Sequence, residues 1–509
     1  MSALLALLLA LATDDSKFLI QEPLAAQRVD YLILAGDPFA NRLEELASYR
    51  KKQGYAVGII AVSSLKGQLI RDFLAHAVEK WTRPAPTYLL LVGDVDTVPT
   101  VNRPHDSPAW EPDLATDFEY ACPNRELDPI LHVGRFPCDT VEELQLMIRK
   151  TLDYETNLPS GPWQKRVSFL AGTAGFSKEA DAAIEKLFAQ IVGGTIPSYY
   201  DVEVAYANPR SPYCPFPPSF NDNGIRLLNE GSLLYVFVGH GSRDSVASFQ
   251  WEGKTYEVLE DDHATKIDVH AGLPVMVVIA CSTGEIDSKE DCLGESCFKV
   301  AKGPVAFLGG SRITHPYGNS LLGKELALHL LGDSKTLGEG LTRVKRAILA
   351  HEADKLTKQI DFMSAMMGIK KEGMEAIRKD VVRHYNLLGD PALMLRRPAP
   401  SIQITFENGI VTVEGTVGEV TLTLECAREK LAKPAPKIDR KDPDYETKVN
   451  QRYRDANNKV LQTWNVKLSD GKGREEIELP KEPGTYHLKA SSGEIVGSLE
   501  VKVELPKGP

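Results

Sequence analysis

The sequence is short of basic charge and of long apolar runs, and each shortage excludes a class of protein. Its 509 residues carry 59 Lys and Arg against 70 Asp and Glu, a formal net charge of −11. Proteins built to bind nucleic acid or anionic lipid need basic patches, so neither partner is expected. No apolar run reaches the length of a membrane-spanning helix, so we expect no transmembrane segment.

Cysteine is scarce as well, and its spacing is irregular. The seven cysteines lie at positions 122, 138, 214, 281, 292, 297 and 426, and no two of them form a Cys-x-x-Cys pair. This spacing favours neither a zinc ribbon nor a thioredoxin-type redox site. An odd number leaves at least one thiol without a partner in the chain, and one cysteine is therefore a candidate for chemistry.

The N-terminus, MSALLALLLALATDD, holds a short apolar stretch that ends in Ala-Leu-Ala. Such a stretch before small residues is typical of a signal peptide and is too short to cross a membrane. No Lys or Arg precedes it, so a helical extension is the alternative interpretation. We favour export, with a signal peptide over residues 1–12 and a secreted, periplasmic or extracellular protein.

Continuous apolar runs that end in Gly, Cys or Asp recur along the chain. They lie at residues 30–39, 87–99, 232–244, 274–284 and 303–312. Continuous apolar strands are typical of parallel sheets covered by helices, and helical stretches separate these runs. The pattern predicts an α/β fold whose functional crevice lies off the carboxyl ends of the strands. We expect the strands that end at Gly93, His240 and Cys281 to be parallel.

The pattern of apolar and polar residues changes at Pro398-Ala399-Pro400, a stretch that is typical of a linker. Short alternating stretches follow, such as SIQITF, IVTVEG and VTLTLE, and they predict a β-sandwich over residues 401–509. A charged stretch between Glu429 and Lys459 interrupts them. We expect that stretch to be a long solvated loop or hairpin.

One histidine and one cysteine occupy equivalent places on two consecutive apolar runs. His240 lies between two glycines in YVFVGHGS, and Cys281 ends the run in PVMVVIACSTG. A cysteine nucleophile needs a base or a neighbouring charge, and donors directed at the developing oxyanion. The backbone N–H groups of Gly241 and Cys281 are the candidate donors, because glycine leaves its amide uncovered. Together these groups would form an acyl-transfer site.

Each motif also has a plainer interpretation. A free cysteine after an apolar run is most often a small hydrophobe in the core, and Gly-His-Gly is a common turn. A metal site that combines His240 and Cys281 with His263 or His315 lacks a recognised ligand spacing. The pairing of the two motifs on consecutive strand ends favours a nucleophile and its base.

These motifs resemble the gingipain-type cysteine peptidases of the caspase-like clan. Further blocks occur in the family's order: DYLILAGDPF, YLLLVGDVDTVPT, HVGRFPCDTVEELQLMIRKTLDYE and YNLLGDPALML. The resemblance covers roughly residues 28–397. It implies a caspase-like parallel-sheet catalytic unit of two α/β subdomains, 28–160 and 161–397, followed by an immunoglobulin-like β-sandwich at 401–509. It also implies a secreted endopeptidase that requires no cofactor, and the family's calcium sites map to no residues here.

By this resemblance, His240 corresponds to the general base and Cys281 to the nucleophile, with the amides of Gly241 and Cys281 as oxyanion donors. Arginine-cleaving members support the histidine with a glutamate, in a block that matches LAGTAGFS at 170–177, which contains no acid. We therefore expect a Cys–His dyad with a backbone carbonyl that orients His240. Asp181 matches the aspartate that binds a basic P1 side chain, and its alternative role is that of an ordinary acid in the first turn of a helix.

Three further acids near strand ends, Asp94, Asp96 and Asp117, are expected at the same crevice. The expected partners are protein or peptide substrates, with Arg or Lys as the P1 residue. The alternative function is a non-catalytic extracellular binding protein that retains the peptidase fold and uses the β-sandwich. The intact pair of His240 and Cys281 argues against that alternative, since a scaffold needs neither.

Overall fold

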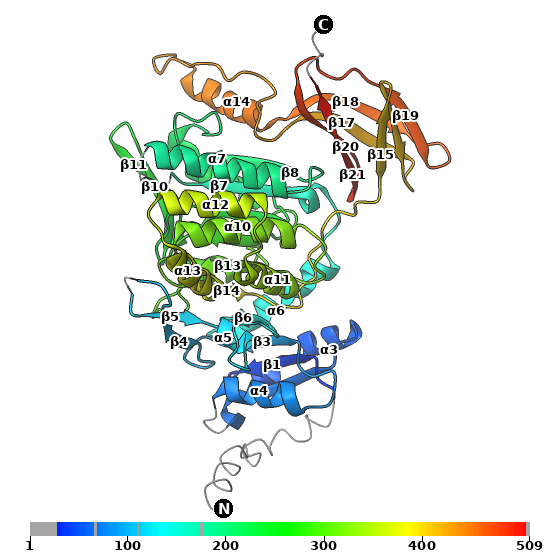
Figure 1. Cartoon of the computed structure of the whole chain (residues 1–509). Helices are drawn as coiled ribbons and strands as arrows, with labels where there is room; N and C mark the ends of the chain where they lie inside the picture. Colours follow the sequence, from blue (N-terminus) through cyan, green and yellow to red (C-terminus); the bar gives the residue numbers. More distant parts are fainter. Residues whose placement is uncertain (1–27, 66–68, 110, 174, 176–177, 505–509) are drawn as a thin grey trace, which may run out of the picture.

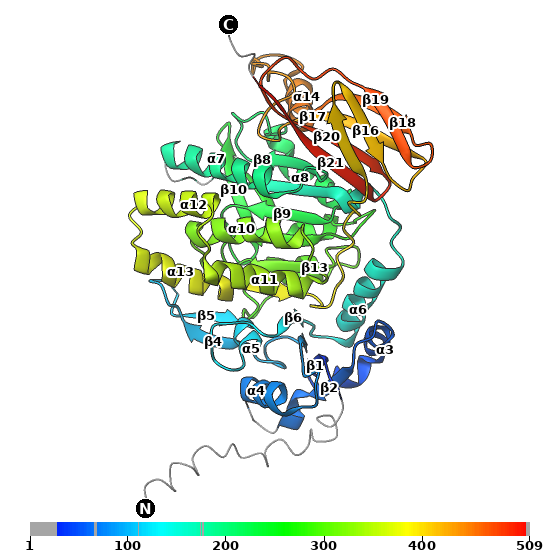
Figure 2. The ribbon, with the colours of Figure 1, turned by 45° about the vertical axis from the view of Figure 1, so that its right-hand side comes forward.

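The computed structural model describes residues 28–65, 69–109, 111–173, 175 and 178–504. The predicted signal peptide, residues 1–12, lies outside the described residues. A ten-stranded sheet crosses the molecule in the order β2-β1-β3-β6-β14-β13-β12-β9-β7-β8. Figures 1 and 2 show helices packed against it, with the N-terminal strands at one end and a separate β domain at the other.

The N-terminal half of the sheet consists of four parallel strands. These strands are β1 (Tyr31–Ala35), β2 (Val57–Ala61), β3 (Tyr88–Val92) and β6 (His132–Phe136). The helices of this half are α3 (Glu44–Lys52), α4 (Ile70–Lys80), α5 (Phe118–Ala121) and α6 (Val141–Thr156). Between β3 and α5 the chain forms an antiparallel pair, β4 (Val101–Pro104) and β5 (Asp113–Thr116).

The C-terminal half of the sheet has five parallel strands and a sixth, β14, at the junction. These are β7 (Arg166–Ala171), β8 (Asp201–Tyr206), β9 (Leu234–Val238), β12 (Val275–Ile279), β13 (Ala306–Gly310) and β14 (Tyr385–Leu388). The helices are α7 (Lys178–Thr195), α8 (Phe220–Asn229), α9 (Leu293–Phe298), α10 (Pro316–Leu330), α11 (Leu337–Ala350), α12 (Lys355–Met366) and α13 (Lys371–His384). A hairpin of β10 (Ser245–Trp251) and β11 (Lys254–Glu260) follows β9.

The central strands are apolar along their whole length because both faces of the sheet are covered. Every residue of β1, β12 and β13 is buried. Burial of each large aliphatic side chain contributes about 1.5–3 kcal/mol. This packing makes the strands rigid supports for whatever residues follow them.

The sheet reverses direction where its two halves meet. β14 pairs antiparallel with β13 and parallel with β6, which is parallel to β3. β3 therefore runs opposite to β9 and β12, so the prediction of a common direction for the strands ending at Gly93, His240 and Cys281 is wrong. A buried apolar run has the same sequence pattern in either direction, so the pattern could not reveal the reversal. β9 and β12 themselves are parallel neighbours.

A separate β domain follows the linker at Pro398. One sheet contains β15 (Gln403–Glu407), β16 (Ile410–Glu414) and β19 (Lys472–Glu476), and the other contains β17 (Glu419–Cys426), β18 (Val460–Lys467), β20 (Gly484–Ser492) and β21 (Ile495–Val503). All their pairings are antiparallel. Side chains from both sheets, such as Val411 and Leu422, share one core.

The charged stretch 429–459 is not only a solvated loop or hairpin, as the sequence predicted, because it contains helix α14 (Tyr445–Asn457). Val449, Tyr453 and Ala456 are buried on one face of this helix. The Tyr453 hydroxyl donates to Glu203 of β8 at 2.8 Å. Three buried side chains at helical spacing in an otherwise charged segment are too weak a periodic pattern to predict the helix from the sequence.

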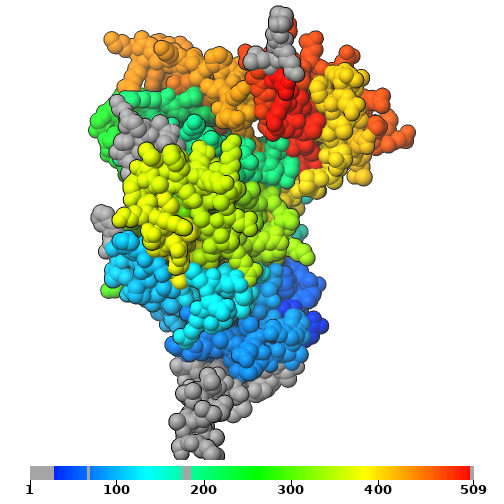
Figure 3. Space-filling model, in the orientation of Figure 1, coloured from blue at the N-terminus to red at the C-terminus, as the bar shows by residue number. Residues whose placement is uncertain are grey.

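The β domain packs directly on the rest of the protein, as the space-filling view in Figure 3 shows, and its contacts there include the edge strand β8 of the ten-stranded sheet. The Asn457 side chain accepts a hydrogen bond from the backbone N–H of Val204 at 2.8 Å and donates to its carbonyl at 3.1 Å. Arg428 donates to the carbonyls of Pro197 and Tyr200 at 2.7 and 2.8 Å. Helix α14 and the residues around it therefore cover the edge strand β8. Among the described helices, none is both long and apolar enough to span a bilayer.

Candidate active site

The two residues singled out in the sequence stand at neighbouring strand ends. His240 follows β9 and Cys281 follows β12, and Val238 pairs with Ile279 where these parallel strands end. The N–H of Gly239 donates to the carbonyl of Ile279 at 3.2 Å, which continues the pairing beyond the strands. His240 is exposed and Cys281 is half-buried, although β12 is wholly buried and β9 is buried except for its last residue. The carboxyl edge of the sheet therefore presents a histidine and a cysteine at adjacent strand ends.

Glycine at position 241 lets the loop that follows β9 contact the loop that follows β12. A Cβ atom there would lie 2.9 Å from the Cβ of Ala280, from the carbonyl oxygen of Cys281 and from Cγ2 of Thr283. Only glycine fits that space, so the Gly-His-Gly sequence has a steric cause. The loop after His240 is thereby held against the backbone that carries the thiol.

The chain turns sharply away after Cys281. Ser282 adopts a φ of 54°, in the left-handed region that side-chain-bearing residues rarely occupy. Its N–H donates to the carbonyl of Arg312 at 3.0 Å. This contact with the loop after β13 holds the strained turn, which leaves Cys281 at the sheet edge.

The amides of Gly241 and Cys281 were predicted to be oxyanion donors. Within the described part of the chain, neither N–H donates a hydrogen bond to another protein group. Both residues are only partly buried. The two amides are therefore available to a ligand at this edge, as an oxyanion hole requires.

A chain of hydrogen bonds that the sequence did not reveal leads to the sulfur of Cys281. The backbone N–H of Thr314 lies 3.3 Å from Sγ, and the Thr314 hydroxyl lies 3.7 Å from it. Asn319 donates to the Thr314 hydroxyl at 2.8 Å, and the Tyr385 hydroxyl donates to Asn319 at 2.8 Å. The N–H of Thr314 is directed at the sulfur and fixes its position at the sheet edge. In the sequence, only the apolar run that ends at Gly310 indicated that a third loop follows a strand at this edge of the sheet.

The histidine lies beside the block that the resemblance aligned with a supporting glutamate. A Cβ atom on Gly175 would lie 4.0 Å from Nε2 of His240, and the N–H of Gly172 donates to the carbonyl of Val238 at 2.9 Å. Residues 174, 176 and 177 of this block lie outside the described part of the chain. The expected backbone carbonyl that orients His240 therefore stays a prediction.

The acidic residues named from the sequence separate into three groups. Asp181 lies in the first turn of α7, and its side chain lies outside the described part of the structure, so its role stays a prediction. Asp117 is buried and receives two hydrogen bonds of 2.8 Å from Arg135. Asp94 and Asp96 follow β3, whose carboxyl end faces the opposite edge of the sheet. We therefore expect that none of Asp94, Asp96 and Asp117 lies at the sheet edge that holds Cys281.

Accessibility distinguishes Cys281 from the other cysteines. Of the seven cysteines, all within the described ranges, six are buried and Cys281 is not. Burial raises the pKa of each of those six thiols, for Cys297 to about 12. Because the thiolate is the nucleophile, these six are poor candidates for catalysis. Cys281 is the thiol that a substrate can reach.

A metal site receives no support from the described residues. They contain no group of three or more His, Cys, Asp or Glu side chains that could hold a metal ion. His263 lies 3.1 Å from the side-chain amide of Asn221, and His315 accepts a hydrogen bond from the N–H of Tyr317 at the start of α10. Both histidines therefore serve their own local structure.

An accessible thiol and imidazole at adjacent ends of a mostly parallel sheet are the arrangement of a cysteine peptidase. The same fold occurs in the crystal structure of the Arg-specific cysteine proteinase gingipain R, with a TM-score of 0.55 and 17% identity over 94% of this chain and 98% of that chain. The profile of peptidase family C25 matches residues 24–396. The chain therefore belongs to this family of gingipain-type cysteine peptidases.

Curated relatives are distant and much longer. Gingipain R2 of Porphyromonas gingivalis is 20% identical over 391 residues, which is 74% of this chain and 47% of the relative. Lys-gingipain of the same species is 22% identical over 292 residues, which is 56% of this chain and 16% of the relative. The chain thus spans less than half the length of these relatives.

Proposed function

We propose that this protein is a cysteine endopeptidase that hydrolyses peptide bonds through a dyad of Cys281 and His240 and a covalent acyl-enzyme. The observation that carries the proposal is the placement of Cys281, the one cysteine that is not buried, next to the exposed His240 at the ends of paired strands. Membership in peptidase family C25 supports the same chemistry.

In this reaction His240 accepts the thiol proton of Cys281, and the sulfur attacks the peptide carbonyl carbon. The negative charge that develops on the carbonyl oxygen is stabilised by the amides of Gly241 and Cys281. His240 then protonates the leaving amine as the carbon–nitrogen bond breaks. Water then attacks the thioester carbonyl while His240 accepts one of its protons. The carbon–sulfur bond breaks, the acyl group leaves as the carboxylic acid product, and His240 returns the proton to the sulfur of Cys281. The N–H of Thr314 holds the sulfur in position for the attack.

The finer parts of the proposal concern substrate, location and the β domain. Cleavage after Arg or Lys rests on Asp181 and on the names of two similar proteins, the Arg-specific gingipain R and Lys-gingipain. Secretion rests on residues 1–12, and no cofactor is required by the mechanism. Seven antiparallel strands in two sheets that share a core support an immunoglobulin-like sandwich at 401–509.

The decisive variants are Cys281→Ala and His240→Ala. Each should lower peptide cleavage by on the order of 10⁴-fold or more, and the double variant should be little worse, because the two residues act as a unit. Cys297→Ala, which changes a buried thiol, is the matched control and should keep its activity. Iodoacetamide should label Cys281 before the other cysteines. Cleavage at the wild-type rate by Cys281→Ala would show that the nucleophile is another residue.

A peptide library with Arg, Lys and neutral P1 residues tests the specificity in the same assay. If Asp181 pairs with a guanidinium, Asp181→Ala should lose most activity on Arg peptides and retain the residual activity on neutral ones. Unchanged selectivity would leave Asp181 with its ordinary role in the first turn of α7. A wild-type protein that labels with iodoacetamide but cleaves no peptide would favour the non-catalytic binding protein instead.

A further inference from the structure

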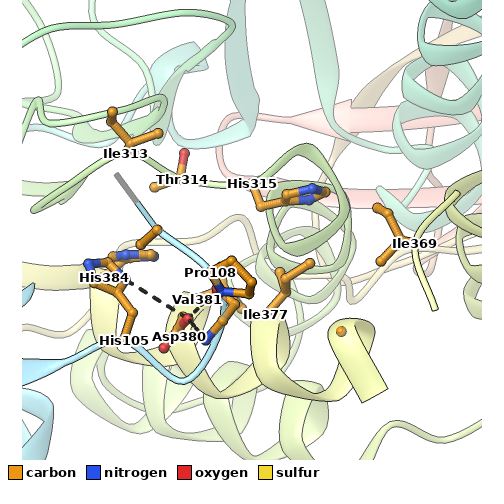
Figure 4. Close-up of a pocket in the computed structure, with 13 residues that line it drawn as sticks. His105, Pro108, Ile313, Thr314, His315, Ile369, Ile377, Asp380, Val381 and His384 are labelled. Atoms are coloured by element: carbon orange, nitrogen blue, oxygen red, sulfur yellow. Dashed lines mark hydrogen bonds and ion pairs between the residues drawn. The ribbon is translucent and has the colours of Figure 1, made fainter. Parts of the chain in front are cut away.

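A cavity of about 320 Å³ lies beside the loop that contacts Cys281 (Figure 4). Thr314, whose N–H lies 3.3 Å from the sulfur, is one of its lining residues. His105, Pro108, Ile313, Ile377 and His384 are others. The volume is at the lower end of the range for small-ligand sites and suits a single large side chain.

The cavity lies on the side of Cys281 away from α7. It is built from the loop after β13, from α13 and from the loop after β4, whereas Asp181 belongs to the helix that follows β7. In the sheet, β13 and β7 lie on opposite sides of the pair β12 and β9. A peptide over Cys281 would therefore direct one side chain toward α7 and another toward this cavity.

The walls of the cavity are apolar. Ile377 and Val381 come from α13, Ile369 comes from the loop before it, and Pro108 faces them from the N-terminal half, as Figure 4 shows. Ile313 also lines the cavity and has 43% of its surface exposed, so it is accessible to a ligand. Such walls favour the apolar body of a side chain.

The one carboxylate in the lining is already occupied. Asp380 accepts hydrogen bonds from the N–H groups of Asp106 and Ser107 at 2.8 Å each and from the Ser107 hydroxyl at 2.5 Å. Nδ1 of His105 lies 3.9 Å from the same carboxylate. Asp380 therefore holds the loop 105–107 in place and has little acceptor capacity left for a substrate cation.

Two imidazoles supply hydrogen-bonding groups that no other described residue uses. The rings of His105 and His384 lie 5.3 Å apart, and Nε2 of each is buried without a hydrogen-bond partner among the described residues. His384 is only 4% exposed, and burial lowers its pKa to about 4, so the ring is neutral at neutral pH. A buried polar atom without a partner is unfavourable, and a polar group of a bound side chain would satisfy it.

We propose that this cavity is a substrate subsite that takes a neutral aromatic side chain with a polar tip, tyrosine above all. The ring would contact the apolar walls, and the hydroxyl would hydrogen-bond an imidazole Nε2. A Lys or Arg side chain would lose its hydration without gaining a free carboxylate. The inference rests on the proposed peptidase function, and it names one side chain of the substrate that the candidate active site would select.

Gly373→Leu tests the subsite because Gly373 lines the cavity from α13. A Cβ atom there would meet only Cγ2 of Ile369 at 3.5 Å, an ordinary contact, so the helix accepts a larger residue that fills the cavity. The matched control is Gly194→Leu in α7, where a Cβ atom meets nothing within 4 Å. Thermal unfolding and iodoacetamide labelling of Cys281 would show that both variants are folded with a reactive site.

The measurement is kcat/KM on peptides that differ at one position near the scissile bond, with Tyr, Phe, Ala or Lys there. At one position the wild type should prefer Tyr to Phe and Lys by about 10-fold or more. Gly373→Leu should lose this preference while retaining its rate on the Ala peptide, and Gly194→Leu should match the wild type. Cleavage without a Tyr preference at any position, or an equal effect of Gly373→Leu on all four peptides, would overturn the subsite but not the peptidase. No cleavage of any peptide by the wild type would overturn both.

Discussion

The two halves of the ten-stranded sheet have the same sequence pattern, an apolar run that ends in small polar residues, but they use it differently. In the N-terminal half, Arg135 is fully buried and donates to Asp117 and to the carbonyls of Gly93 and Val98, at 2.9 and 2.7 Å for the last two. The polar groups at these strand ends therefore stabilise the fold. In the C-terminal half, the thiol of Cys281 and the imidazole of His240 remain accessible.

A second buried cluster in the N-terminal half supports this contrast. Arg50 has no exposed surface and pairs with Glu155 at 3.0 Å and with Asp390 at 2.8 Å. Asp390 belongs to the conspicuous block YNLLGDPALML, so part of the resemblance to the family reflects structure rather than catalysis. A polar residue after an apolar run indicates a strand end, and its accessibility indicates whether chemistry can occur there.

The largest effect on stability is expected from breaking the ion pair of the N-terminal half. Arg135→Met would leave the Asp117 carboxylate and two carbonyls buried without partners, and it should lower the free energy of unfolding by about 3–5 kcal/mol. Cys281→Ala should change it by less than about 1 kcal/mol. Urea unfolding curves of both variants measure the difference.

The control for Arg135 is Arg346→Met, which breaks an exposed pair with Asp128 at 2.8 Å. It should lower the free energy of unfolding by less than about 1 kcal/mol. If the two variants lost the same free energy of unfolding, the ion pair of Arg135 would not stabilise the fold more than an exposed pair does.

The contact between the two halves should strengthen at alkaline pH. Lys150 of α6 donates to the carbonyls of Phe298 and Val300 at the end of α9, and burial lowers its pKa to about 7. In the unfolded chain its pKa is about 10.4. Between these values the unfolded state binds a proton that the folded state does not, so stability should rise with pH.

Lys150→Met removes this titration. The free energy of unfolding of the wild type relative to this variant should rise by on the order of 2 kcal/mol between pH 7 and 9. Below pH 7 the lysine is charged in both states, and the relative value should become constant. A difference that stays flat across pH 7 to 9 would show that the Lys150 amine is solvated in the folded protein.

The smallest predicted effect concerns the support of the thiol in the C-terminal half. Tyr385→Phe removes the hydroxyl that donates to Asn319, a hydrogen bond of about 1 kcal/mol. We expect the reaction of Cys281 with iodoacetamide to slow by about 5-fold at neutral pH, because Thr314, whose N–H contacts the sulfur, is held less firmly. The rate of iodoacetamide labelling at one neutral pH measures this effect.

Tyr317→Phe is the matched control for Tyr385. It also removes a buried hydroxyl, one that donates to Asp361 at 2.9 Å, but it has no hydrogen bond to Asn319 or Thr314. Its labelling rate should match that of the wild type. If both tyrosine variants had the same labelling rate, Tyr385 would have no role in positioning the thiol.

The sequence predicted the features that depend on local pattern. Buried strands before His240 and Cys281 and a β domain after Pro398 follow from apolar runs and turn residues, and the family follows from several short blocks. The antiparallel pairing of β14 could not be predicted, because the run YNLL specifies a strand but not its direction. Thr314, Asn319 and Tyr385 come from three different elements, and only the tertiary fold brings them to the sulfur.

The covering of β8 by Asn457 has a practical consequence for producing the protein. An uncovered edge strand offers free N–H and C=O groups to any other chain, and such edges promote aggregation. A shortened polypeptide that stops at the linker would keep every residue of the candidate active site but would expose Val204 and its neighbours along this edge. The β domain thus protects the solubility of the catalytic unit, and recombinant expression should retain it.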